Sequence, residues 1–71
     1  MKTIKIREDE EYIKLGQLMK KANMVSRGEE AKILISEENV LVNGKVENRR
    51  GKKLYDGDTV TFGDETVVVM K

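Results

Sequence analysis

The chain begins with a polar–apolar alternation over residues 3–7, which predicts a short strand. Between Lys14 and Asn23 the apolar residues instead recur about every 3.6 positions, which predicts an amphipathic helix. These apolar residues are Leu15, Leu18, Met19 and Ala22. Because a glycine in a helix interior costs about 1 kcal/mol, we place the helix start near Lys14, so that Gly16 lies in the first turn. Asn23 is a suitable left-handed end.

A second helix is predicted from about Arg27 to Glu37. Ser26 and Glu29 fit a capping box, in which Ser26 is the N-cap and Glu29 occupies the third helical position. Asn39 is placed to end the helix. The apolar residues of its buried side are Ala31, Leu34 and Ile35.

A β-hairpin is predicted next, over residues 40–47. Residues 40–42 are three apolar β-formers, and residues 45–47 alternate as a returning strand. Between them, Asn43-Gly44 is the strongest short-range signal for a two-residue turn, because both central residues of that turn need positive φ.

Two more strands are predicted near the end of the chain, over residues 59–62 and 66–70. Gly63-Asp64 suits a tight turn between them, and the continuous valines at 67–69 favour a strand covered on both faces. Residues 55–58 form a turn before the first of these strands. The predicted fold is therefore α+β, with two short helices packed on a small, mostly antiparallel sheet.

Composition restricts the chemistry of the 71 residues, which we take as a single domain over 1–71. The chain has neither cysteine nor histidine, which excludes disulfides and zinc or haem ligation by thiol or imidazole. Asp56 and Asp58 fit a turn better than a metal pair, so we expect no metal and no cofactor. The N-terminal segment has no apolar run long enough for a signal peptide or a membrane span, so we expect a cytoplasmic protein that does not contact membranes.

Positive charge is concentrated after the Asn-Gly turn. Residues 43–53 carry a local charge of +4 in a chain whose net charge is only +1. The basic residues are Lys45, Arg49, Arg50, Lys52 and Lys53. Arginine offers planar, bidentate donors to phosphate and lysine adds point charge, so we interpret the segment as an RNA-binding surface. The alternative is a charged edge strand that discourages aggregation. Aromatic residues make up only 4% of the chain, which favours phosphate and shape recognition over base stacking.

Four segments carry a resemblance to a known family: KLGQLM at 14–19, VSRGEEAK at 25–32, VLVNGKV at 40–46 and GDTV at 57–60. In this order and spacing they resemble the alpha-L RNA-binding motif, the S4 domain, named after a protein of the small ribosomal subunit. The motif core covers about residues 14–62. The additional strands at both ends make the chain similar to the small stand-alone bacterial version of the domain.

The resemblance implies that structured RNA is held between the first helix, the start of the second and the hairpin. It assigns the basic residue that opens the first helix to Lys14, and the hairpin contacts to Asn43, Gly44 and Lys45. The family often has arginine where Gly28 stands, and in this chain Arg27 lies one position earlier. It also often has aspartate where Gly16 stands. The candidate RNA-binding residues are Lys14, Gln17, Lys21, Arg27, Lys32, Asn43, Gly44, Lys45, Arg49, Arg50, Lys52 and Lys53.

We therefore expect a monomeric, non-catalytic protein that binds structured RNA, with ribosomal RNA or a ribosome-assembly particle as first choice of partner and tRNA as second. Catalysis is not expected, because the chain lacks a nucleophile–base pair and a glycine-rich phosphate loop. One alternative is a protein-docking module of ubiquitin-like character, although the chain ends in Val69-Met70-Lys71 and not in the Gly-Gly of sulfur carriers. Another is an accessory that delivers RNA, such as tRNA, to an enzyme.

Overall fold

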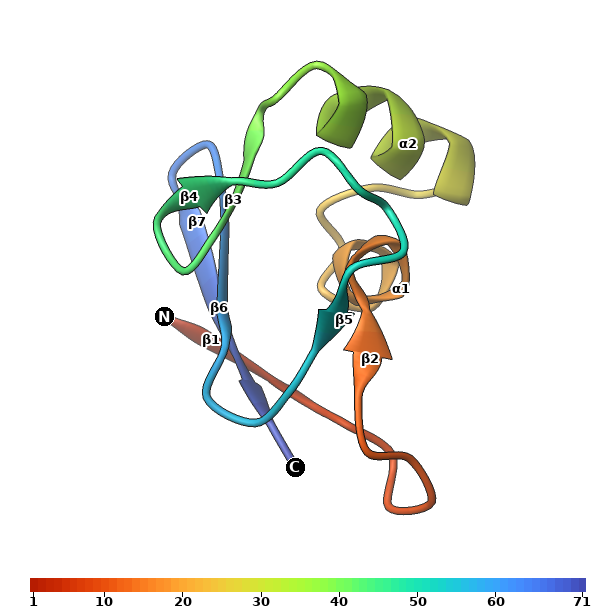
Figure 1. Ribbon diagram of the computed structural model, residues 1–71, viewed down its shortest axis with the longest axis vertical. Coiled ribbons are helices and arrows are strands. Elements are labelled where there is room, and N and C mark those ends of the chain that lie inside the picture. Colours follow the sequence, from red (N-terminus) through yellow and green to blue (C-terminus); the bar gives the residue numbers. More distant parts are fainter.

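The computed structural model describes residues 1–71 and is built on a five-stranded sheet (Figure 1). Its strand order is β1-β7-β6-β3-β4, and all neighbours are antiparallel except β1 and β7. The strands are β1 (Lys2–Lys5), β3 (Val40–Val42), β4 (Lys45–Val46), β6 (Thr59–Phe62) and β7 (Glu65–Met70). The predicted mostly antiparallel sheet is confirmed.

Two further strands, which the sequence pattern did not predict, form a separate antiparallel pair. They are β2 (Ile13–Lys14) and β5 (Lys53–Leu54). Each has only two residues, which is too short for a period of two to be visible. Their pairing fixes the end of the basic segment beside the start of the first helix.

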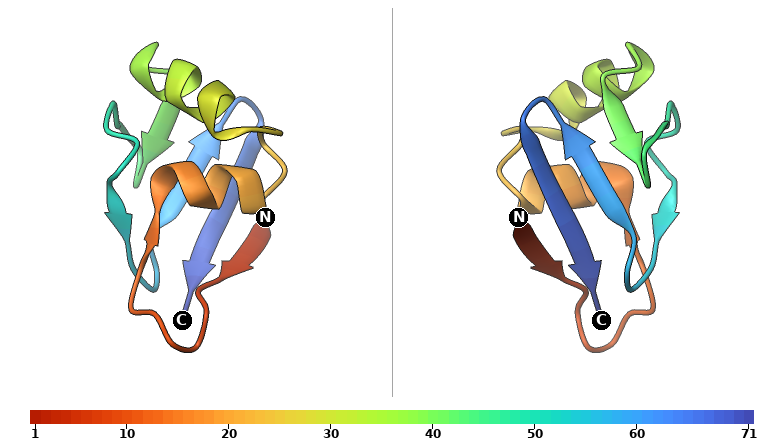
Figure 2. Two further views of the ribbon diagram at one scale, coloured as in Figure 1. Left: turned by 90° about the vertical axis from the view of Figure 1, so that its right-hand side faces the viewer. Right: turned by 90° about the vertical axis from the view of Figure 1, so that its left-hand side faces the viewer.

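The helices are α1 (Leu15–Lys21) and α2 (Gly28–Ser36), and both lie on one side of the sheet (Figure 2). Asn23 follows α1 with φ of 60°, as predicted for a left-handed helix end. Neither helix has the length and hydrophobicity that a membrane crossing requires.

The predicted ends of α2 are wrong in detail. The N-cap is Arg27 and not Ser26, and the helix begins one residue later than the capping box requires. Glu30 consequently occupies the third helical position, and its carboxylate accepts a hydrogen bond from the Ser26 N–H at 3.3 Å. At the other end the left-handed residue is Glu38, with φ of 63°, and not the predicted Asn39.

The core contains fifteen buried apolar residues and no buried polar residue, and it lies between the sheet and the helices. Helix α1 contributes Leu15, Leu18 and Met19, and α2 contributes Ala31 and Ile35. On β7, Val67 and Val69 are buried, whereas the intervening Val68 is only half-buried. The prediction that this strand is covered on both faces is therefore wrong, because no element covers the outer face of the sheet.

Both predicted tight turns are confirmed by their backbone angles. Asn43 and Gly44 have φ of 52° and 82°, as a two-residue hairpin turn of the primed type requires. Gly63 has φ of 62° at the first central position of the β6–β7 turn. The returning strand after Gly44 ends at Val46, so the cations from Arg49 onward follow the hairpin and do not belong to it.

Candidate nucleic-acid interface

The loop between β4 and β5, residues 47–52, crosses the start of α1 and carries three of the predicted basic residues, Arg49, Arg50 and Lys52. The first N–H groups of a helix have no partner within the helix. Here the N–H of Leu15 donates to the carbonyl oxygen of Lys52 at 2.9 Å, and that of Gly16 donates to the carbonyl oxygen of Arg50 at 3.1 Å. Main-chain hydrogen bonds therefore fix the loop on the helix.

The absence of a side chain at Gly16 leaves room for this crossing. A Cβ atom at position 16 would lie 2.7 Å from Cγ of Arg50, closer than two carbon atoms normally approach. Gly16, one of the two positions at which this chain departs from the family pattern, thus permits close contact with the loop. The same contact places the Arg50 side chain along the first turn of α1.

A hollow of about 300 Å³ opens where the loop meets the helices. No apolar residue and no acid lines it. Its lining consists of Lys14, Gly16, Gln17, Lys20, Gly28, Arg50 and Gly51. Three cations therefore surround a surface in which three glycines leave the backbone accessible.

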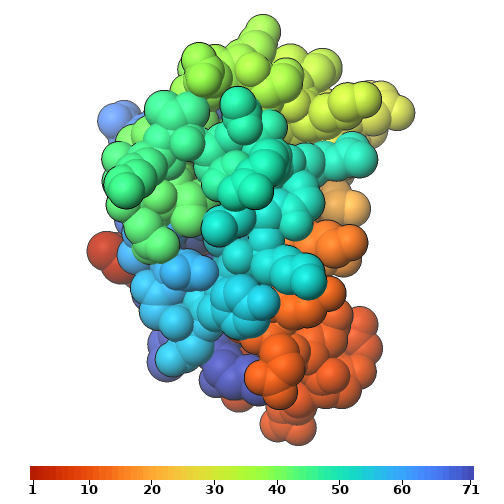
Figure 3. All heavy atoms as spheres, in the orientation of Figure 1, coloured from red at the N-terminus to blue at the C-terminus, as the bar shows by residue number.

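A second hollow lies on the other side of Gly51, which lines both. Its remaining lining consists of Arg49, Lys52, Lys53 and Tyr55. We call the six cations of the two hollows the basic surface: Lys14, Lys20, Arg49, Arg50, Lys52 and Lys53. Figure 3 shows the loop, in teal and cyan, exposed between the green β3–β4 hairpin and the orange residues that lead into α1.

Five of these six cations form no ion pair. The exception is Arg49, whose Nε lies 3.0 Å from a carboxylate oxygen of Glu47. The side-chain hydrogen bond from Arg49 holds the pKa of Glu47 below its usual range, although partial burial opposes the effect. The same hydrogen bond raises the pKa of Arg49. The basic surface consequently keeps nearly all of its positive charge available to a ligand.

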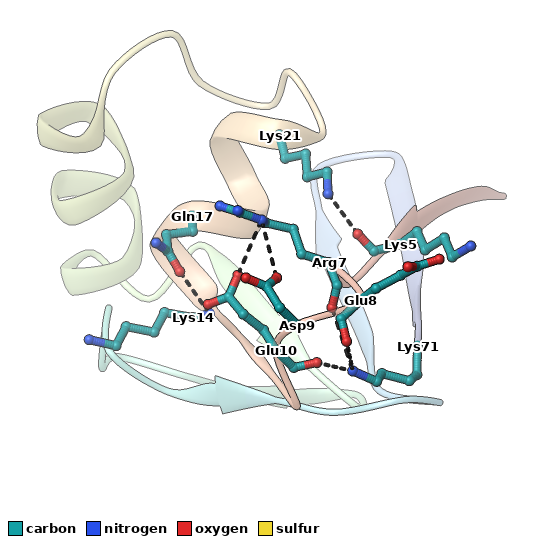
Figure 4. A network of polar contacts seen from close by, with 9 residues as sticks. All are labelled: Lys5, Arg7, Glu8, Asp9, Glu10, Lys14, Gln17, Lys21 and Lys71. Atoms are coloured by element: carbon teal, nitrogen blue, oxygen red, sulfur yellow. Dashed lines mark hydrogen bonds and ion pairs between the residues drawn. The ribbon is translucent and has the colours of Figure 1, made fainter.

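Lys21 does not lie on the basic surface. Its Nζ donates to the carbonyl oxygen of Lys5 at 2.6 Å, and it lines a separate hollow that also contains Arg7 and Glu10 (Figure 4). Gln17 lines this hollow as well as the first one. Of these candidate RNA-binding residues, Lys14 and Gln17 therefore line the first hollow, whereas Gln17 and Lys21 line the separate one.

The remaining predicted residues of α2 and the hairpin are exposed but line neither of the two basic hollows. They are Arg27, Lys32, Asn43, Gly44 and Lys45. Arg27 directly precedes Gly28, which does line the first hollow, and Lys32 follows Gly28 by one helical turn.

The side chain of Asn43 forms hydrogen bonds within the fold. Its Oδ1 accepts a hydrogen bond from the Thr59 N–H at 2.9 Å, and its Nδ2 donates to Oδ1 of Asp58 at 3.0 Å. The other carboxylate oxygen of Asp58 accepts from the Tyr55 N–H at 2.7 Å. Asp56 accepts from the N–H of Lys71 at 2.9 Å. These bonds support the interpretation of both aspartates as turn residues.

Lys20 and Gly51 were missed by the sequence reasoning. Lys20 lies three residues after Gln17 and four after Gly16, so helical spacing alone would have placed it beside them. The signal for Gly51 is weaker, because its role depends on how the loop crosses α1.

The chain is similar in sequence to a known family and to known proteins. The model of a family described as the S4 domain matches residues 4–70. RlbA of Bacillus subtilis (strain 168), named a probable ribosome maturation protein, is 49% identical over 63 residues, which cover 84% of this chain and 89% of RlbA. YbcJ of Escherichia coli (strain K12), named a candidate RNA-binding protein, is 37% identical over 59 residues, which cover 83% of this chain and 84% of YbcJ.

The fold is also similar to a solved structure. The solution structure of Escherichia coli YbcJ, described as revealing an alpha-L motif involved in RNA binding, aligns with a TM-score of 0.76 and 34% identity. The alignment covers 100% of this chain and 89% of YbcJ. A family match over nearly the whole chain, two relatives of similar length and a shared fold lead to one conclusion: the chain belongs to the S4 domain family.

Proposed function

We propose that this protein binds structured RNA through the basic surface and catalyses no reaction on it. The proposal rests on one observation: two hollows that share Gly51 are lined by six cations and by no carboxylate. Phosphate groups dominate the affinity of proteins for nucleic acid, and each neutralised phosphate releases a counterion. A surface of this kind favours a ligand with several phosphates over a single small anion.

The shape of the surface favours folded RNA. The cations come from β2, α1, the loop and β5, and Arg50 bridges the loop and α1 because its side chain lies against Gly16. Such a spread of charge over rigid elements matches phosphates held at fixed distances. Flexible single strands are instead bound mainly on several aromatic platforms. Only one aromatic residue, Tyr55, lines the two hollows.

Ribosomal RNA, free or in a ribosome-assembly particle, is the RNA that we propose first, and tRNA is the second choice. The support comes from RlbA, which is named for ribosome maturation and shares 49% identity. The absence of catalysis is supported by the lining of the hollows, which offers no carboxylate, histidine or cysteine as a base or nucleophile. We further propose that the protein acts as a monomeric single domain in the cytoplasm.

Sedimentation of the protein with ribosomal particles tests the proposal. Lysate containing the tagged protein is separated on a sucrose gradient at low salt, and the protein is located by immunoblot. We expect it in the fractions of a ribosomal subunit or its precursor, and a Lys14→Gln/Lys20→Gln/Arg50→Gln variant at the top of the gradient. Lys5→Gln is the matched control, because Lys5 points away from Lys14 (Figure 4). Wild-type protein that stays at the top, and also fails to bind purified ribosomal RNA and tRNA, would contradict the proposal.

A further inference from the structure

An exposed aromatic ring lies on the basic surface. Tyr55 lines the second hollow beside Arg49, Lys52 and Lys53, and half of the residue, 50%, is accessible to solvent. The hydrophobic core does not include it. Exposed single aromatic residues are common on proteins, but this one is surrounded by cations and belongs to a chain with only three aromatic residues.

The ring of Tyr55 packs against a second aromatic ring, that of Tyr12. Its centroid lies 5.9 Å from that of Tyr12, and the two planes are inclined by 54°, a favourable tilted arrangement. Nζ of Lys53 lies 4.9 Å from the centroid of the Tyr12 ring, within the range of a cation–π contact. Tyr12 thus supports Tyr55 on one side, and its own contact with Lys53 links the pair to the basic surface.

The backbone of Tyr55 is fixed as well. Its N–H donates to Asp58 Oδ2 at 2.7 Å, and its carbonyl oxygen accepts from the Asp58 N–H at 3.0 Å. Asp58 is in turn bound by Asn43 of the hairpin. An aromatic platform on a closed turn loses little conformational entropy when a flat group stacks on it.

We propose that the second hollow receives one unpaired base of the RNA, stacked on Tyr55, while Arg49, Lys52 and Lys53 contact the neighbouring phosphates. The inference rests on the proposed function and narrows its ligand. The RNA would be a helix interrupted by an unpaired nucleotide, since a base within a continuous duplex is already stacked between its neighbours. Because every base has a π-face, stacking on one ring requires an unpaired base but not a particular one.

The test uses two RNA hairpins with the same stem, one of which carries a single unpaired 2-aminopurine. We expect wild-type protein to bind the interrupted hairpin about five to ten times more tightly, the lower part of the range for base–aromatic stacking. Binding should also quench the fluorescence of 2-aminopurine. Tyr55→Leu should remove both the preference and the quenching, whereas Tyr55→Phe should keep them, because phenylalanine retains the ring.

The outcomes separate this inference from the proposed function. Equal binding of both hairpins by wild type, weakened for both by Arg50→Gln, would overturn the stacking site and leave RNA binding intact. A preference or a quenching that survives in Tyr55→Leu would also overturn it. Failure of wild type to bind either hairpin at low salt would contradict the proposed function together with the inference. Thermal unfolding of each variant shows that the comparison is made on folded protein.

Discussion

The basic surface and the turn before β2 both contain cations, but they differ in whether acidic residues pair with those cations. In the turn, Arg7 lies 3.5 Å from a carboxylate oxygen of Asp9 and 3.8 Å from one of Glu10 (Figure 4). Nζ of Lys71 donates to carbonyl oxygens of the same turn, those of Arg7, Glu8 and Glu10. On the basic surface, five of six cations have no carboxylate partner.

The difference separates charges that serve the fold from charges that are available to a ligand. Residues 8–11 are four consecutive acids in the sequence, yet their charge is partly matched by the neighbouring Arg7. The loop between β4 and β5 uses its carbonyl oxygens to bind α1 and leaves its cationic side chains in solvent. Backbone groups hold the loop in place, so its side chains remain free for phosphate.

The largest expected effect follows from removing the charge of the loop and β5. Replacing Arg49, Arg50, Lys52 and Lys53 with serine should weaken the binding of ribosomal RNA about a hundredfold or more, because four phosphate partners are lost. Thermal unfolding should change little, since these side chains lie outside the core. Lys5→Ser serves as the control on the far edge of the sheet. RNA binding that persists in the fourfold variant would show that the phosphate contacts lie elsewhere.

Asn43 distinguishes a structural residue from a ligand contact. Asn43→Ala should lower the free energy of unfolding by about 1–2 kcal/mol, because alanine is strained at positive φ and cannot replace the bonds to Thr59 and Asp58. Urea unfolding measures the loss. Asn43→Gly should recover part of it, since glycine tolerates the backbone angle. The folded variants should bind RNA normally, and reduced affinity at unchanged stability would instead make Asn43 a direct contact.

Gly16→Ala tests whether the close contact of loop and helix positions Arg50. Alanine in a helix normally adds about 1 kcal/mol of stability relative to glycine, but here the new Cβ must displace the Arg50 side chain. We expect no gain in urea unfolding and an RNA affinity about fivefold lower. Gly28→Ala is the matched control for stability, because a Cβ at that position meets no atom within 4 Å. Tighter RNA binding by Gly16→Ala would contradict the positioning of Arg50.

Glu47 gives the smallest expected effect, because it is the one carboxylate paired with the basic surface. Glu47→Gln should raise RNA affinity about twofold by leaving Arg49 unpaired. Because the folded-state pKa of Glu47 is lowered, its stabilisation is present at neutral pH and is lost as the pH falls through that pKa. Urea unfolding of Glu47→Gln should therefore depend less on pH in the acidic range. If the stability of Glu47→Gln depends on acidic pH as strongly as that of wild type, Glu47 does not contribute to the pH dependence.

Most of the fold follows from local signals in the sequence. The apolar spacing predicts α1, and Asn43-Gly44 predicts the hairpin turn. Both conformations depend on neighbouring residues more than on contacts with distant parts of the chain. The position of β5 could not be found in this way, because its two residues form a strand only through their pairing with Ile13 and Lys14. The one-residue error at the start of α2 has a similar cause: Arg27 caps the helix without a side-chain hydrogen bond, so no residue type marks the position.

The residue types of the candidate site could be predicted from the sequence, but their arrangement in space could not. The cluster of cations after the hairpin is evident in the sequence, and the structure places Lys14 beside Arg50 as the proposal requires. The exclusion of Lys21 and the inclusion of Lys20 depend on which side of α1 faces the loop, where Arg50 lies against Gly16. Helical spacing places Lys20 beside Gln17 but places Lys21 there as well, so the choice between the two lysines depends on the tertiary contact.

The salt dependence of RNA binding tests the central claim most directly. The logarithm of the affinity for a ribosomal RNA fragment is plotted against the logarithm of salt concentration for wild type, Lys5→Gln and the Lys14→Gln/Lys20→Gln/Arg50→Gln variant. We expect a steep negative slope for the first two proteins, corresponding to about four to six phosphates, and a slope smaller in magnitude by about two to three for the triple variant. A slope near zero for wild type, or the same slope for all three proteins, would contradict the account.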